Sequence, residues 1–252
     1  MRRYTILFVL LGVLLGVTIW MTVLGSVGIF QMAPPRKVLT ALFRHLQLVG
    51  IAEGMAICVG IPIGFMSTRR AFRFISPVLI GIANVGQTVP TLAFIGIAGA
   101  FLGLGFRAAV VALFAYAVLP IIRNTYAGIR SVDPAIKEAA RGMGMSKGQV
   151  TVRAELPLAM PVIVAGIRTS TVVNVGTAAV AGMIGAGGLG ELIVTGIAVR
   201  VTQLILQGAA PTAALAVILD ASLGEMENML TPRGLQVMKQ RQAAAAGTGR
   251  GA

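Results

Sequence analysis

The chain has 252 residues, of which 56% are hydrophobic and only 12% are charged, and its formal net charge is +13. Soluble domains are usually about 45–50% apolar and about 25% charged, so this composition excludes an ordinary soluble fold. The basic residues lie between apolar runs and do not alternate with aromatic residues, which favours membrane loops over a nucleic-acid surface. One cysteine, Cys58, and one histidine, His45, leave no intrachain disulfide and no cysteine or histidine metal cluster.

Six apolar runs are long enough to cross a bilayer, because a spanning helix needs about 20 apolar residues. They cover residues 4–30, 46–66, 75–104, 108–122, 156–180 and 202–223. The first run exceeds the apolar core of a signal peptide, about 7–15 residues, so we expect a retained anchor. The third run is too long for one straight helix, and we expect Pro90 to break or kink it.

These runs predict an all-α polytopic membrane protein with three parts. Residues 1–35 hold the anchor helix, residues 36–230 hold the other spans, and residues 231–252 form a cytoplasmic tail. The end of this tail is rich in Ala, Gly, Gln and Arg without an apolar period, so we expect it to be disordered.

The lysines and arginines predict the orientation, because they are enriched in cytoplasmic loops. With the N-terminus inside, fifteen of the 21 fall on the cytoplasmic side, five fall outside, and Arg168 falls within a span. Both termini are therefore predicted to be cytoplasmic. An odd number of spans would place the basic tail outside, so six spans are self-consistent.

The segment 133–157, between the fourth and fifth spans, has the pattern of two short helices. Asp133 suits an N-cap and Pro134 the first helical position, and Gly142 and Gly144 can end the helix. Ser146 can cap a second short helix toward Leu156. The apolar residues Ile136, Ala139, Ala140 and Met143 share one helical face. The residues alone leave two interpretations open, namely a linker or a contact surface for a partner.

The same segment resembles the signature loop of binding-protein-dependent ABC importer permeases, of the type I fold. The matching positions are Glu138, Ala139, Ala140, Gly144, Leu156 and Pro157, while Ala154 is a weak departure from a larger apolar residue. In that family the loop forms a coupling helix that docks into a cleft of the ATPase subunit. The resemblance implies a separate ATPase that binds ATP and Mg, a second permease copy or paralogue, an extracytoplasmic solute-binding protein and an inner-membrane location.

Further segments resemble the osmoprotectant branch of the family, which imports glycine betaine, choline or carnitine. They start at His45, Asn84, Gly166 and Asn174, and the last runs on to a glycine-rich stretch at 185–190. That stretch alone also fits methionine and phosphonate importer permeases, which remain alternatives. It does not precede Lys-Ser or Lys-Thr, so it is no phosphate loop, and we expect a re-entrant turn near an outer gate.

Several polar and small residues are candidates for the pathway or its gates. They are Gln87, Thr88, Pro90, Thr171, Asn174, Gly187 and Gly188. The polar side chains among them can either line a pathway or bond between helices, and the sequence leaves both readings open.

Three ionisable residues fall within predicted spans, namely Glu53, Arg168 and Asp220. Such residues are costly in lipid and usually face protein or water. We expect Glu53 and Arg168 to neutralise each other between the second and fifth spans, and Asp220 to reach the membrane interface.

Two other function classes fit less well. A secondary transporter often has two repeated halves and needs coupling-ion sites, and no internal repeat is visible. A membrane-embedded enzyme needs a catalytic cluster, which these scattered ionisable residues do not form. We therefore expect a transport subunit with no cofactor of its own.

Overall fold

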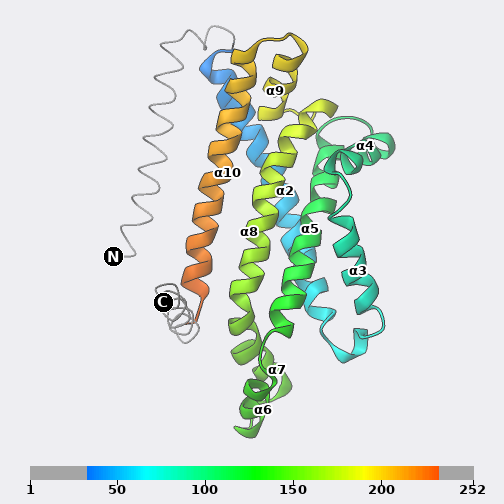
Figure 1. The fold of residues 1–252 in the computed structure, drawn as a ribbon, viewed down its shortest axis with the longest axis vertical. Helices are drawn as coiled ribbons and strands as arrows, with labels where there is room; N and C mark the ends of the chain where they lie inside the picture. The colour runs from blue at the N-terminus through cyan, green and yellow to red at the C-terminus, as the bar shows by residue number, and fades with distance from the viewer. Residues whose placement is uncertain (1–32, 233–252) are drawn as a thin grey trace, which may run out of the picture.

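A computed structural model describes residues 33–232, and these residues form helices and connecting turns (Figure 1). The elements in chain order are α2 (Pro35–Met66), η2 (Arg70–Phe72), α3 (Ser76–Gly86), α4 (Thr91–Leu102), α5 (Phe106–Arg130), α6 (Pro134–Gly142), α7 (Lys147–Val150), the π-helical turn η3 (Thr151–Glu155), α8 (Leu156–Val180), η4 (Ala181–Ile184), α9 (Leu189–Ala198) and α10 (Thr202–Leu230). The predicted anchor at 4–30 and nearly all of the predicted tail lie outside the described residues.

Within the described residues, four helical stretches are long and apolar enough to cross a membrane, and a broken pair, α3 with α4, can serve as a fifth. They correspond to the second through sixth predicted spans, so the all-α polytopic fold is confirmed. The broken pair takes the place of the long third run, and the helix direction bends by 102° between α3 and α4. Pro90 lies at the break, as the sequence predicted, directly before the first residue of α4.

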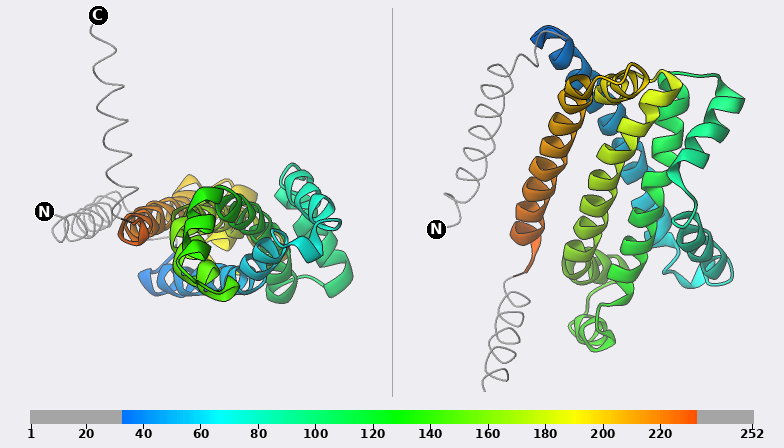
Figure 2. Two further views of the ribbon diagram at one scale, coloured as in Figure 1. Left: turned by 90° about the horizontal axis from the view of Figure 1, so that it is seen from below. Right: turned by 45° about the horizontal axis from the view of Figure 1, so that its top comes forward.

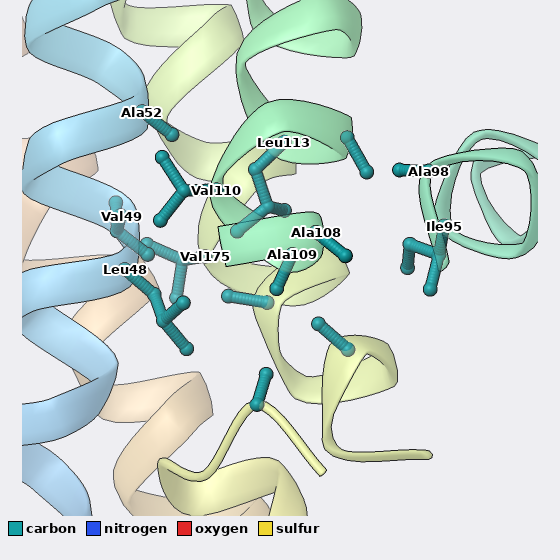
Figure 3. Packing of buried hydrophobic residues seen from close by; sticks show 14 of the residues in the cluster. Leu48, Val49, Ala52, Ile95, Ala98, Ala108, Ala109, Val110, Leu113 and Val175 are labelled. Atoms are coloured by element: carbon teal, nitrogen blue, oxygen red, sulfur yellow. The ribbon is translucent and has the colours of Figure 1, made fainter. Parts of the chain in front are cut away.

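The core of the bundle lies between α2, α5 and α8, with α10 packed on α8 and with α3 and α4 on α5 (Figures 1 and 2). Its largest apolar cluster joins Leu48 and Val49 of α2 to Leu113 of α5 and Val175 of α8, and it includes several alanines (Figure 3). Small residues allow membrane helices to approach closely and gain dispersion contacts.

Two glycines of α2 set the approach of α2 to α5. A Cβ atom on Gly60 would lie 2.8 Å from a side-chain carbon of Ile121, and one on Gly64 would lie 2.7 Å from the carbonyl oxygen of Ile122. The four-residue spacing places both glycines on one face of α2. This pair therefore acts as a small-residue interface of the kind that membrane helices use to pack.

The two ends of the bundle carry different connections (Figure 1). The turn from α2 to α3 lies at the same end as α6 and α7, while the turn before α9 lies at the opposite end. Within the described residues, the two segments that the charge pattern assigned to the cytoplasmic side, 69–73 and 123–153, thus lie at the same end of the bundle.

Candidate functional site

The helix α6 begins and ends at the residues that the sequence indicated. The Asp133 carboxylate accepts a hydrogen bond of 2.8 Å from the backbone N–H of Ala135, and Pro134 is the first helical residue. Gly144, just beyond the helix, has a φ of 83°, which a side chain would resist. Ser146 and Gln149 then form a reciprocal capping box that starts α7. The predicted helix, glycine turn and second helix are therefore confirmed.

The outer face of α6 is apolar and exposed. Ile136 is 42% exposed and Met143 is 72% exposed, and Glu138 and Ala139 are exposed beside them. Ala140, by contrast, is buried within the chain itself. Ala140, one of the positions that resemble the family's signature loop, therefore differs from the other three apolar residues of this face in being buried. Its small size serves internal packing, and Ala139 is the small residue that a partner can approach.

The second short helix, which was expected to run toward Leu156, continues into the fifth predicted span. Residues from Lys147 to Ile184 form one helical run, in which the π turn η3 joins α7 to α8. Pro157 has no N–H, and a proline ring normally clashes with the carbonyl four residues earlier. The wider turn directly before it accommodates the ring without a break in the helix. Leu156 packs on a buried cluster that contains Ile129 and Ala159.

The most connected side chain near this loop is Glu155, which the sequence analysis did not single out. Its carboxylate accepts a hydrogen bond of 2.8 Å from Arg69 and lies 3.4 Å from the ammonium group of Lys137. The Thr151 hydroxyl donates to it at 3.2 Å.

The three intramembrane charges pair differently from the prediction. Arg168 of α8 makes two hydrogen bonds of 2.6 Å to the Asp220 carboxylate of α10, and Glu227 lies 3.7 Å away. Glu53 instead accepts hydrogen bonds of 3.1 Å from Ser170 and from Asn174. The predicted pair of Glu53 with Arg168 was therefore wrong, because Arg168 pairs with Asp220; the expected position of Asp220 at the membrane interface stays a prediction.

The helical repeat of α8 explains this pairing. Successive helix residues are about 100° apart, so Ser170 points about 200° away from Arg168, whereas Asn174 lies one turn after Ser170. The face with Ser170 and Asn174 meets α2, and the opposite face with Arg168 meets α10. Arg168 therefore pairs with Asp220 of α10, because α10 packs on the face of α8 that carries Arg168.

The candidate pathway residues other than the two glycines fall into two groups. Gln87, Thr88 and Pro90 lie at the break between α3 and α4, where the Gln87 amide donates to the carbonyl of Ala83 and Thr88 is exposed. Thr171 and Asn174 lie buried in the bundle. The geometry favours bonding between helices for Asn174, whose amide donates to Glu53. The break between α3 and α4, by contrast, exposes a polar side chain, that of Thr88.

The glycine-rich turn packs directly against α2. Gly185, Gly187 and Gly188 all have positive φ angles, and a Cβ atom on Gly188 would lie 3.3 Å from the Cα of His45. His45 is fully buried, and its Nε2 lies 3.1 Å from the carbonyl oxygen of Val175. A cavity of about 390 Å³ lies between this turn, Arg44 and α9. Among residues 33–232 no three His, Cys, Asp or Glu side chains gather as a metal site.

Comparisons with known proteins agree with this geometry. Residues 60–227 match the family described as "Binding-protein-dependent transport system inner membrane component". The chain is 42% identical over 213 residues to the glycine betaine/carnitine/choline transport system permease protein OpuCD of Bacillus subtilis (strain 168), with 84% of this chain and 92% of that protein covered. It is 39% identical over 199 residues to the osmoprotectant import permease protein OsmW of Salmonella typhimurium, with 77% and 92% covered.

The fold is shared with solved transporters. An inward-facing structure of the MetNI methionine ABC transporter superposes with a TM-score of 0.67 at 21% identity and covers 78% of this chain and 97% of that one. At this level of identity the likeness establishes the fold alone.

Proposed function

The chain belongs to the family of binding-protein-dependent transport system inner-membrane components, and on that premise we propose that it imports a small osmoprotectant such as glycine betaine, choline or carnitine. Relatives that are 39–42% identical carry these solutes in their names and are matched over nearly their whole length. The likeness to a methionine transporter, at 21% identity, concerns the fold. The osmoprotectant assignment therefore rests on the sequence relatives.

In this proposal the chain forms the pathway and a separate ATPase subunit, with ATP and Mg, supplies the energy. A second permease chain completes the pathway, and an extracytoplasmic binding protein delivers the solute. The observation that carries the assignment to α6 is its exposed apolar face, where Ile136 and Met143 surround the small Ala139. An apolar patch at the end of a membrane bundle, next to charged residues such as Glu138, suits a protein partner. We assign Glu138, Ala139 and Gly144 to this contact.

The orientation belongs to the same proposal. The end of the bundle with α6 is cytoplasmic and the end with α9 is external, in line with the excess of basic residues on the first side. A reporter fused after Arg241 is expected to read cytoplasmic, and one inserted at Gly187 is expected to read external. The reverse pattern would contradict the assignment of α6 to the ATPase.

A large side chain on the contact face tests the role of α6. Ala139→Trp places its bulk outside the chain, because Ala139 is exposed, and an overpacked contact typically loses about 1–3 kcal/mol. We expect normal membrane levels, weaker co-purification of the ATPase and reduced uptake. Ala198→Trp is the matched control, because Ala198 is also an exposed helical alanine but lies in α9 at the opposite end. Equal ATPase retention and uptake in both variants would refute the contact.

A further inference from the structure

We propose that Glu155 is a positioning residue of the coupling step, one that ties the coupling helix α6 to the turn leading into the broken span. This inference rests on the proposed function and extends it to Glu155, which is not among the positions that match the family's signature loop. The carboxylate holds two cations that come from different parts of the chain, Lys137 from α6 and Arg69 from the turn after α2. Movement of α6 is therefore passed to that turn.

The contacts of the carboxylate are divided between its two oxygens. Oε2 accepts from Arg69 at 2.8 Å and from the Thr151 hydroxyl at 3.2 Å, while Oε1 lies 3.4 Å from Lys137. The Glu155 side chain is only 8% exposed, and those of Arg69 and Lys137 are 33% and 22% exposed. Arg69 also lies over the Phe65 ring, 4.0 Å from its centre. A screened surface pair contributes little, but this carboxylate is largely withdrawn from water and both of its oxygens are occupied.

The π turn η3, which ends at Glu155, changes the direction of the residues that precede it. A π turn contains one residue more than an α turn, and one added residue rotates all preceding residues by about 100° relative to the rest of a helix. The residues of α7 that precede the turn, up to Val150, are thereby rotated relative to Glu155 and to α8, which starts at Leu156. Thr151 and Glu155 face Arg69, and Val150 is buried. Turns of this kind often occur at functional sites.

The ion pairs of Glu155 connect the coupling helix α6 with the segment that precedes the candidate pathway residues. Arg69 lies three residues beyond the end of α2 and directly before η2, which is followed by α3. The helix α3 ends at the break that carries Gln87, Thr88 and Pro90. One carboxylate thus joins α6, the start of α8 and the connection to the broken span. Coupling between distant sites is carried by such contiguous networks of packed and ion-paired groups.

The test compares variants of the complete transporter reconstituted in proteoliposomes, with solute uptake and ATP hydrolysis measured together. Glu155→Gln and Arg69→Gln are each expected to lower the ratio of solute moved to ATP hydrolysed by roughly two- to thirtyfold, the range that residues in such networks give. The double variant is expected to be no worse than either single one, because both remove the same link. Arg69→Lys keeps the charge and is expected to restore most of the ratio.

The matched control is Arg70→Gln. Arg70 adjoins Arg69 in the chain and is exposed, and its side chain lies outside this cluster of ion pairs among the described residues. A wild-type ratio in Arg70→Gln together with a lowered ratio in Arg69→Gln supports the inference. Equal ratios in all variants, in a transporter whose wild-type form shows ATP-driven uptake, would overturn it and leave the proposed function intact.

A loss of assembly in Glu155→Gln would shift the decision to Lys137→Gln. That substitution removes the link to α6 alone and leaves the hydrogen bond between Arg69 and Glu155 in place. Normal ATPase co-purification with a lowered solute-to-ATP ratio is the expected result. A wild-type ratio in Lys137→Gln would show that the carboxylate only stabilises the turn, and the inference would fail.

Discussion

Removing Arg168 is expected to destabilise the bundle, and removing Asp220 as well is expected to restore part of the loss. In Arg168→Leu the carboxylates of Asp220 and Glu227 lose the cation that holds them at 2.6 Å and 3.7 Å. An uncompensated charge within a membrane helix costs up to about 2.5–3.5 kcal/mol. The side chains of Arg168 and Asp220 are 36% and 43% exposed, so the interaction is smaller than that of a fully buried pair.

The size of the rescue follows from a double-mutant cycle. Contacting residues give interaction energies of about 0.5–3 kcal/mol, and the exposure of this pair places it toward the lower end, at about 1 kcal/mol. The assay is the unfolding free energy of purified protein in mixed micelles for Arg168→Leu, Asp220→Leu and the double variant. The control cycle pairs Arg168→Leu with Glu53→Leu, which share no hydrogen-bond partner. Rescue in the control cycle but not in the Asp220 cycle would refute the pairing.

Two glycine substitutions test local geometry. Gly190→Ala is expected to prevent α9 from packing and to lower the unfolding midpoint, because its Cβ would collide with the carbonyl of Ala179, whereas Gly176→Ala, with no neighbour within 4 Å, is expected to be neutral. Equal midpoints for these two variants would contradict this packing. Gly144→Val is expected to reduce uptake at normal membrane levels, because the φ of 83° at Gly144 is strained for a residue with a side chain. Gly142→Val is the control, since Gly142 lies at an α-helical position. Equal uptake in both variants would contradict the need for glycine at position 144.

Apolar run length and local capping rules were sufficient to predict much of this fold. The spans follow from run length, and the ends of α6 follow from the side chains of Asp133 and the backbone freedom of Gly144. The break before Pro90 was also predictable, because proline disrupts the hydrogen bonding of a helix. All of these are local effects, which is why a single sequence carries them.

The contacts between distant segments were not predictable from local patterns. Counting charges within spans suggested Glu53 as the partner of Arg168, although the phase of α8 separates Arg168 from Ser170 and Asn174. A helical-wheel argument could have separated the two faces, but it could not have named α10 as the neighbour. Glu155 was missed because its contact with Arg69 joins two residues that are 86 positions apart in the chain.

Under the proposed function, this chain moves solute at the expense of ATP hydrolysis on a partner subunit. The most direct measurement is uptake of labelled glycine betaine, choline and carnitine into proteoliposomes that contain the chain, its partner permease if distinct, the ATPase and the binding protein. Uptake that requires enclosed ATP at the ATPase side, persists without any ion gradient and is unaffected by excess methionine is the predicted result. Uptake driven by an ion gradient without ATP would contradict ATP-driven import by this chain.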